Sequence, residues 1–379
     1  MATSFKKKTS SRGRGNLPPG VRPSLNNNQL LVSTGCPSLD TLLGGGLALG
    51  TLMLVAEDAH QSYTNALRKL FIGEGVVCGH SLFLAASPGE DAASVVQGIP
   101  RDVNAPSEKE ESGKKDESND LQIAWRYKNQ PKVDAGISHH TQFGHYFDLS
   151  TTLSEEKVAS LDCSTFTPQS QDLDTMQQGV KVAYKKLLKS IAEKLEANKL
   201  FTDSSSNDVP GVLRIQIPSL GSPMWREDLI TASSDSYTPS LAWFLLALRS
   251  LLRRSYCVAM VSVPVHLFEE THFVHRVQRC ADVVVRLESF AGCPDKSQNP
   301  LFKEYHGLFH VRKAPHVNSI CGSLVDTSDL AFKLKKRKFL IEKLHLPPDI
   351  SETASRSNAV KPGVPLCSAT TPVNNLLDF

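Results

Sequence analysis

Two carboxylates and a threonine occupy one short turn of this chain, between an apolar run and a helical pattern. Thr51–Ala56 (TLMLVA) is continuously apolar and predicts a buried strand, and Thr64–Glu74 predicts a helix ended by Gly75. The turn between them reads Glu57–Thr64 (EDAHQSYT). A turn that enters a helix N-terminus after a strand is a common phosphate site, because free amides and the helix dipole favour anions. Phosphate binding is therefore the chemistry to test here.

A working phosphate loop has the pattern G-x-x-x-x-G-K-[ST]. Glu57 stands at the first glycine, Ser62 at the second and Tyr63 at the lysine, so only Thr64, the magnesium position, is kept. A carboxylate near a triphosphate is unfavourable, since two like charges at ~4 Å cost about 1 kcal/mol in water and several times more in a partly buried site. We expect a vestigial nucleotide loop at Glu57, Ser62, Tyr63 and Thr64, with no catalytic residue and no cofactor in this chain.

A second carboxylate is missing where magnesium chemistry would need it. The apolar run Val212–Ile217 predicts a strand, and an acid is expected at its end. The chain has Pro218 and Ser219 there instead, and proline offers neither charge nor N–H. Two separate losses thus argue against phosphoryl transfer by this chain alone.

The residues before the turn carry a resemblance. LVSTGCPSLDTLLGGGLALG resembles the opening of RecA-like P-loop ATPases, with the matching residues Ser33, Thr34, Gly35, Leu39, Asp40, Leu42, Leu43, Gly44, Gly45, Gly46 and Gly50. The resemblance implies an α/β, RecA-like fold with a mainly parallel central sheet flanked by helices and degenerate Walker A and B motifs. The alternation of apolar strand, helix and apolar strand (Ser81–Ala86) independently favours a parallel sheet covered on both faces. Ser38 or Asp40 is expected to cap a short helix.

Composition and charge bound the remaining possibilities. The chain has 379 residues, 40% hydrophobic content and a formal net charge of +3, which argues against nucleic-acid binding over its whole surface. Its eight cysteines are scattered singly, so no metal site is predicted. The longest apolar stretch, Leu241–Leu248, is far shorter than the ~20 residues of a membrane span. We expect a protein without membrane contact, in the cytoplasm and also the nucleus.

Three regions are predicted along the chain. Residues 1–28 form a basic tail expected to be disordered, and residues 351–379 a second disordered tail. Residues 29–350 form one domain, with a charged linker near 101–120 and an insertion near 151–175. Its later elements are an amphipathic helix at 176–199, a helix at 241–254, and strands at 212–217, 256–263, 282–287 and 307–312.

A narrower resemblance covers nearly the whole chain outside the tails and insertions. Segments such as IAWRY (Ile123–Tyr127), FGHYFD (Phe143–Asp148), ADVVVRLESF (Ala281–Phe290), YHGLFHVRKAP (Tyr305–Pro315) and LAFKLKKRKFLIEKLHLPPD (Leu330–Asp349) resemble the fourth subunit of the Elongator complex. That family implies a hetero-hexameric RecA-like ring with the fifth and sixth Elongator subunits. The ring docks on the catalytic core, binds tRNA and supports 5-carboxymethyl-type modification of wobble uridine. Any ATP turnover then belongs to ring interfaces or partner subunits.

Several side chains keep two interpretations. Arg253, Arg254, Arg276 and Arg279 are candidate RNA contacts, although solvated or salt-bridged helix ends are the more common case. His266, His272 and His275 are clustered but match no standard metal spacing. Trp125 and Tyr127 could stack on a base or pack in the core, and Lys333–Lys338 could meet RNA, act as a nuclear signal or form a solvated strand that faces a partner.

Two other functions stay open at this level. The kept Thr64 and the intact lead-in motif leave room for an atypical RecA-type ATPase acting in tRNA release. The basic tails are the sole support for a nuclear accessory factor of transcription elongation.

Overall fold

The computed structural model describes residues 17–24, 27–87, 90, 92–103, 143–168, 179–202, 209–225, 240–268, 270–292, 304–315, 329–335 and 338–344. Three expectations fall outside these ranges: most of the charged linker near 101–120, the aromatic pair Trp125 and Tyr127, and the tail at 351–379.

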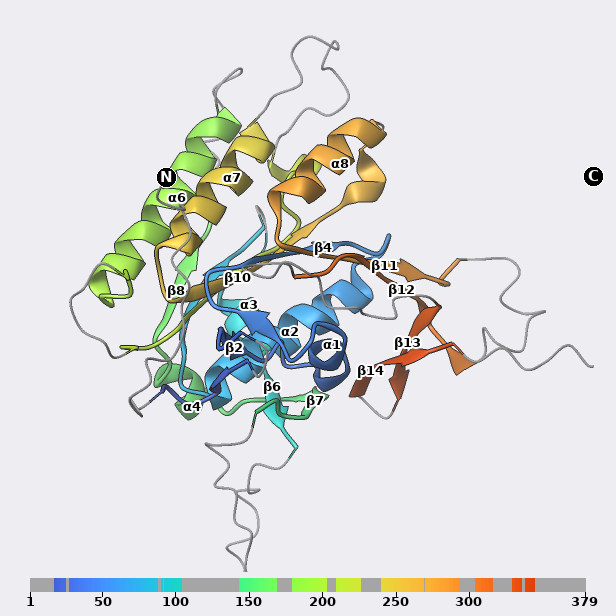
Figure 1. Cartoon of the computed structure of the whole chain (residues 1–379), viewed down its shortest axis with the longest axis horizontal. Helices are drawn as coiled ribbons and strands as arrows, with labels where there is room; N and C mark the ends of the chain where they lie inside the picture. The colour runs from blue at the N-terminus through green and yellow to red at the C-terminus, as the bar shows by residue number, and fades with distance from the viewer. Residues whose placement is uncertain are drawn as a thin grey trace, which may run out of the picture. The chain divides into compact units, whose positions relative to one another are not determined.

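A nine-stranded sheet runs through the molecule (Figure 1). From one edge to the other its strands are β14 (Lys338–Lys343), β13 (Leu330–Lys335), β12 (Gly307–Lys313), β11 (Val283–Ser289), β4 (Leu52–Ala56), β10 (Cys257–Val263), β9 (Leu213–Ile217), β5 (Ser81–Ala85) and β8 (Cys163–Phe166). Neighbours from β11 to β8 are parallel, whereas β12, β13 and β14 pair antiparallel. The expected α/β class with a mainly parallel central sheet is confirmed.

Helices cover both faces of this sheet, as continuous apolar strands require. Figure 1 shows α6 (Gly179–Ala197), α7 (Ser240–Arg253) and α8 (Thr271–Cys280) on one face, with α1 (Pro37–Leu42) and α2 (Ser62–Val77) on the other. The helical spacing predicted for α6 is confirmed, because Tyr184, Leu187, Ile191 and Leu195 all lie in the core.

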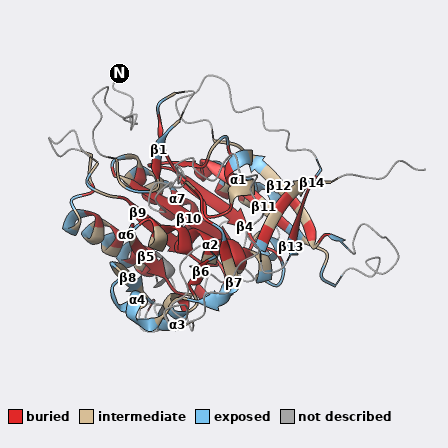
Figure 2. Cartoon of the chain, turned by 90° about the horizontal axis from the view of Figure 1, so that it is seen from below, coloured by how far each residue is buried: buried red, intermediate tan, exposed pale blue. Residues whose placement is uncertain are grey.

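Strand β4 shows how one strand serves two cores. Leu52 and Leu54 pack with α6, α7 and α8, whereas Met53 and Val55 pack with α2. All four side chains are buried, and burying such a side chain contributes about 1.5–3 kcal/mol. Figure 2 shows buried strands between helices whose outer faces are exposed. The turn at Glu57 therefore follows a strand that is buried on both faces.

A strand lies before residue 29, within the stretch expected to be a tail. The strand β1 (Val21–Pro23) pairs antiparallel with β2 (Leu30–Val32), which in turn pairs with β3 (Leu47–Ala48). Composition alone did not reveal β1, since a basic, proline-containing stretch of low hydrophobicity is typical of a tail. Tertiary contacts stabilise it: the Arg22 guanidinium donates to the Gly45 carbonyl at 3.0 Å.

The stretch near 151–175, expected to be an insertion, supplies part of the sheet. The short strand β6 (Pro100–Asp102) pairs with β7 (Phe147–Thr152), and α4 (Glu155–Ala159) leads into β8, which pairs parallel with β5. The short helix α3 (Ala92–Gln97) contacts α4.

In the basic stretch Lys333–Lys338, Lys333 and Lys335 lie in β13 and Lys338 begins β14, so a strand is present, while its pairing with a second strand was not predicted. Strands β13 and β14 form a C-terminal hairpin, with Phe332 and Phe339 stacked at 5.5 Å on its buried side. The Lys333 ammonium is buried and donates to Glu342 at 2.5 Å and Glu304 at 3.4 Å. Within the described part of the chain, no helix is long and apolar enough to cross a membrane.

Candidate functional site

The lead-in motif before β3 is held together by one buried carboxylate. Asp40 accepts hydrogen bonds from the Ser33 hydroxyl at 2.5 Å, and from the Thr34 amide and hydroxyl at 2.7 Å each. Burial raises the pKa of Asp40 despite these donors. The expectation that Ser38 or Asp40 caps α1 is wrong, because Cys36 is the N-cap residue and Pro37 opens the helix. Asp40 instead reaches backwards and fixes the turn that precedes it.

Gly35 explains why this motif needs glycine. Its φ is +81°, and a Cβ there would lie 2.1 Å from the Leu70 carbonyl oxygen on α2. The close approach seats the lead-in turn directly on α2, the helix that follows the candidate nucleotide loop.

The first acid of the loop ties three strand ends together. Glu57 follows β4 and is 4% exposed; its carboxylate accepts from the Ser219 hydroxyl at 2.9 Å and from the Gln61 side-chain amide at 3.1 Å. The Ser219 amide donates to the Ser262 hydroxyl, which comes from β10. Burial raises the pKa of Glu57, although its hydroxyl partners oppose the shift.

The second acid lies at the helix N-terminus. Asp58 is 2% exposed, and one of its carboxylate oxygens accepts from the Thr64 amide at 2.9 Å and from the Thr64 hydroxyl at 2.7 Å. The Tyr63 amide lies 3.4 Å from its other oxygen. Free amides at a helix N-terminus attract anions. In this chain the carboxylate of Asp58 lies at these amides and accepts from them.

Tyr63, at the position of the loop lysine, turns to the sheet instead. Its ring lies 4.7 Å from that of Phe332 on β13 and 5.7 Å from that of His306. Ser62, at the position of the second glycine, is exposed. The structure thus brings Glu57, Tyr63 and Thr64 into one packed loop, bounded by the C-terminal hairpin.

The end of β9, where an acid was expected, is built differently. Ser219 has a φ of +44°, and its hydroxyl points to Glu57. Since the crevice outside the carboxyl ends of parallel strands is the usual ligand position in such sheets, these side chains lie where a site belongs. Hydrogen bonds within the chain satisfy them.

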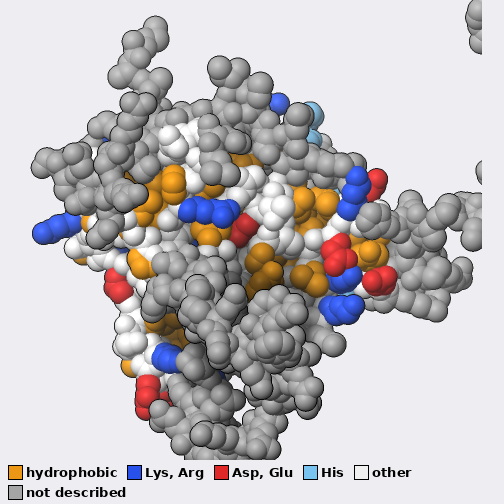
Figure 3. Space-filling model, turned by 60° about the horizontal axis from the view of Figure 1, so that its bottom comes forward, with side chains coloured by type: hydrophobic (Ala, Val, Ile, Leu, Met, Phe, Trp, Pro, Cys, Tyr) orange, Lys and Arg blue, Asp and Glu red, His pale blue; other side chains and the backbone are white. Residues whose placement is uncertain are grey.

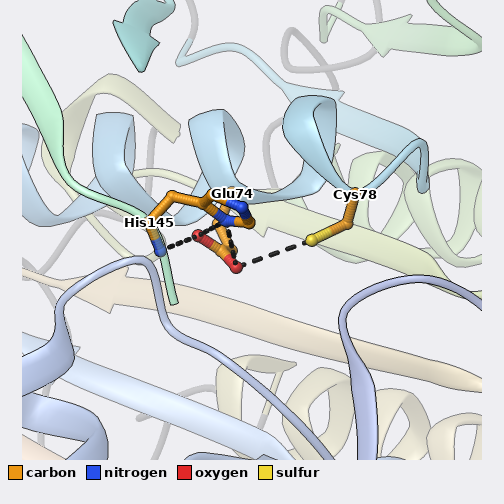
Figure 4. A group of neighbouring side chains, drawn as sticks. All are labelled: Glu74, Cys78 and His145. Carbon is orange, nitrogen blue, oxygen red and sulfur yellow. Dashed lines mark hydrogen bonds and ion pairs between the residues drawn. The ribbon is translucent and has the colours of Figure 1, made fainter. Parts of the chain in front are cut away.

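A buried polar cluster behind the loop was not predicted. Glu74 comes from α2, Cys78 is the C-cap residue of that helix, and His145 comes from the residues before β7 (Figure 4). Glu74 accepts from the His145 amide at 3.0 Å, and Cys78 donates to Glu74 at 3.5 Å. Burial raises the pKa of Glu74, but the bond from His145 and the charge of Arg214 outweigh it and lower the pKa overall.

Arg214 and His80 extend this cluster. The Arg214 Nε donates to His80 Nδ1 at 3.0 Å, and its Nη1 donates to the carbonyls of Ser33 and Phe71. Burial and the neighbouring guanidinium lower the pKa of His80 to about 3, so its ring is neutral and Nε2 donates to the Pro19 carbonyl at 2.9 Å. An arginine inside a buried strand was the signal that could have revealed the cluster.

The ligand atoms of Glu74, Cys78 and His145 lie within 4.8 Å of one another, which raises the question of a metal. The surroundings do not fit one. Arg214 is a buried cation whose charge acts on both Glu74 and Cys78. Burial also raises the pKa of Cys78, whereas a metal needs the thiolate. The group is better described as a hydrogen-bonded ion cluster.

The candidate RNA arginines fall into two groups. Arg253 pairs with the buried Asp282 and donates to the Gly50 carbonyl. Both partners lie where the central strands β11 and β4 begin, at the opposite end of the strands from the loop. Arg254, Arg276 and Arg279 are exposed. On the face drawn in Figure 3, described Lys and Arg side chains are scattered among apolar and acidic ones rather than gathered in one patch.

The three candidate histidines do not form a cluster of ligands. His266 lies in the turn η4 (Val265–Leu267), and His272 and His275 lie on α8, all exposed. Among the described residues, the group of possible metal ligands is Glu74, Cys78 and His145, and none of these three histidines belongs to it.

Comparison of the sequence with known proteins shows the family to which this chain belongs. A family model described as "PAXNEB protein" matches residues 14–371. The chain is 43% identical to "Elongator complex protein 4" of Danio rerio over 364 residues, which is 93% of this chain and 90% of that protein. It is 42% identical to "Elongator complex protein 4" of Homo sapiens, over 89% of this chain and 82% of that protein. The chain therefore belongs to the PAXNEB family, the family of Elongator complex protein 4.

Proposed function

We propose that this chain is a non-catalytic subunit of the Elongator complex. In this proposal its RecA-like fold forms a hetero-hexameric ring with the fifth and sixth Elongator subunits and contacts the catalytic core. The ring binds tRNA and supports 5-carboxymethyl-type modification of wobble uridine, in the cytoplasm and also in the nucleus. Family membership and the wide match to the relatives support the assembly part of the proposal.

The single observation that carries the non-catalytic part is the position of Asp58. Its carboxylate accepts from both polar groups of Thr64, the one residue of a phosphate loop that the chain retains. A magnesium nucleotide would have to displace this carboxylate and would still lack the lysine, since Tyr63 packs on Phe332. We therefore assign no cofactor to this subunit and place any ATP turnover at ring interfaces.

The assembly part is tested by co-purification. The tagged full-length chain, expressed with the fifth and sixth Elongator subunits, should recover both at equal stoichiometry and bind tRNA as the assembled ring. Recovery of the chain alone as a monomer would contradict the ring.

The competing function, an atypical ATPase, is tested on the isolated chain. The kept Thr64 and the intact lead-in turn are the observations in its favour. We expect no ATP hydrolysis by the purified chain, and no difference between Thr64→Ala and the exposed loop control Ser62→Ala. Turnover by the isolated chain that Thr64→Ala abolishes and Ser62→Ala preserves would replace the proposal by the ATPase.

A further inference from the structure

Five consecutive residues, Phe143–Phe147, contact parts of the molecule that are remote in sequence. At one end, the Arg22 guanidinium of β1 lies 3.6 Å from the centre of the Phe143 ring. Near the other end, the Lys338 ammonium of β14 lies 5.0 Å from the centre of the Tyr146 ring. Strands β1 and β14 belong to different sheets, so this segment is a contact that they share.

The middle of the segment is anchored in the core. The His145 amide donates to Glu74 at 3.0 Å, and its ring Nδ1 lies 3.2 Å from both Glu74 oxygens, with both side chains almost fully buried. Gly144 has a φ of +79°, and a Cβ there would lie 3.4 Å from the Ser33 hydroxyl of the lead-in turn. Phe147 is buried, and its ring closely approaches Gly73 of α2.

Such a segment does not move one residue at a time. Its centre has one packed arrangement, because the buried hydrogen bond of His145 to Glu74 and the packing of the Phe147 ring on Gly73 leave no alternative position. A tilt that loosens Phe143 therefore also changes the position of Tyr146. The Tyr146 ring is 42% exposed, so its contact with Lys338 is the more adjustable one.

We propose that Phe143–Phe147 is a clasp that couples strand β1 to the C-terminal hairpin, so that loosening either one loosens the other. The coupling extends to the vestigial loop. The hairpin carries Phe332, which packs on Tyr63, and its Ile341 amide donates to the Ser38 hydroxyl at 3.1 Å. Contacts within the chain, rather than a nucleotide, thereby hold the two ends of the domain together.

Amide hydrogen exchange on the full-length chain tests the clasp. Arg22→Ala removes a contact of Phe143 without touching the hairpin, and Tyr146→Ala removes the ring beneath Lys338. Val103→Ala is the matched control. The Val103 side chain is exposed, and the substitution keeps the hydrogen bond that the Val103 backbone N–H donates to the Tyr146 carbonyl. Tyr146→Phe keeps the ring and serves as the conservative variant. Amide exchange in the central strand β9 reports opening of the whole fold.

We expect Arg22→Ala to raise exchange in the remote hairpin residues 338–343 by about threefold or more, the range set by loss of one cation–π contact. Tyr146→Ala should raise exchange both there and at residues 21–23, while Val103→Ala and Tyr146→Phe should match the original chain. The clasp is overturned if Arg22→Ala acts only at its own strand. It is equally overturned if exchange in β9 rises as much as in the hairpin, since that indicates general destabilisation.

Discussion

Asp58 and Thr64 form a closed pair in which one carboxylate oxygen accepts both the backbone amide and the hydroxyl of the threonine. The two residues stand at opposite ends of a loop whose spacing is that of a phosphate-binding turn. A helix N-terminus needs an anion or an acceptor, and in this chain a neighbouring side chain supplies it. The amides and the hydroxyl that begin this helix are thus satisfied by a side chain of the same loop.

Removing this internal anion should destabilise the fold. Asp58→Ala leaves the amide and hydroxyl of Thr64 buried without their acceptor, so the free energy of unfolding should fall by about 1–3 kcal/mol. Chemical denaturation followed by circular dichroism measures the change. The control Ser62→Ala alters an exposed residue of the same loop and should shift stability by less than about 0.5 kcal/mol. Equal midpoints for Asp58→Ala and the control would show that the carboxylate is not holding the helix.

The lead-in turn should tolerate no side chain at Gly35. Gly35→Ala places a Cβ 2.1 Å from the Leu70 carbonyl oxygen at a φ of +81°, so both backbone strain and a collision result. Gly79→Ala is the matched control, because its φ is +66° but nothing lies within 4 Å of the added Cβ. The control should lose about 1–2 kcal/mol from the left-handed conformation alone, and Gly35→Ala should lose considerably more or fail to fold. Similar thermal midpoints for the two variants would rule out the collision.

The sheet could be predicted from the sequence because its signals are local. Continuous apolar runs such as TLMLVA mark strands buried on both faces, and the structure places β4 at the centre of the sheet. The strand β1 and the C-terminal hairpin could not be predicted in the same way. Their stability comes from partners far along the chain, such as Gly45 for Arg22 and Glu304 for Lys333.

The candidate site was predicted in part. The motif gave the position of Glu57, Tyr63 and Thr64, because a loop between strand and helix has few arrangements. The sequence did not reveal the role of Asp58: the hydrogen bonds that Thr64 donates to it depend on a turn in which Gln61 has a φ of +56°. The cluster of Glu74, His145 and Arg214 joins three distant segments, and no spacing in one sequence reports such a meeting.

Acid should destabilise the protein through His80. Its pKa in the folded chain is about 3, below the ordinary 6.5, because burial and the facing Arg214 disfavour the imidazolium, while the hydrogen bond to Pro19 and the facing Glu74 do not reverse this. Between these pH values the unfolded chain binds a proton that the folded chain does not, so the free energy of unfolding falls as pH drops from about 6.5 towards 3. One unit of separation corresponds to about 1.36 kcal/mol. The lowered pKa of Glu74 adds to the loss at the acidic end.

Denaturation midpoints measured at several pH values check this dependence. His80→Asn should reduce the slope of unfolding free energy against pH in that window, whatever its effect on stability at neutral pH. His272→Asn, at an exposed position on α8, should leave the slope unchanged. A slope in His80→Asn as steep as in the original chain would assign the acid sensitivity to other groups.

Substitution by alanine should affect stability at Arg253 and, if Arg279 contacts RNA, tRNA binding at Arg279. Arg253→Ala leaves the buried Asp282 with Arg249 as its remaining ion-pair partner, at 2.7 Å, and a weakened buried pair costs up to about 3–5 kcal/mol. Its main effect should therefore be on unfolding midpoints.

Arg279→Ala removes an exposed charge and should leave stability within about 0.5 kcal/mol. If Arg279 contacts a phosphate, tRNA binding by the assembled ring should weaken, and the magnitude of the salt dependence should fall by about one ion per arginine. Binding titrations at several salt concentrations separate the two cases, and an unchanged affinity and slope in Arg279→Ala would remove this residue from the RNA surface.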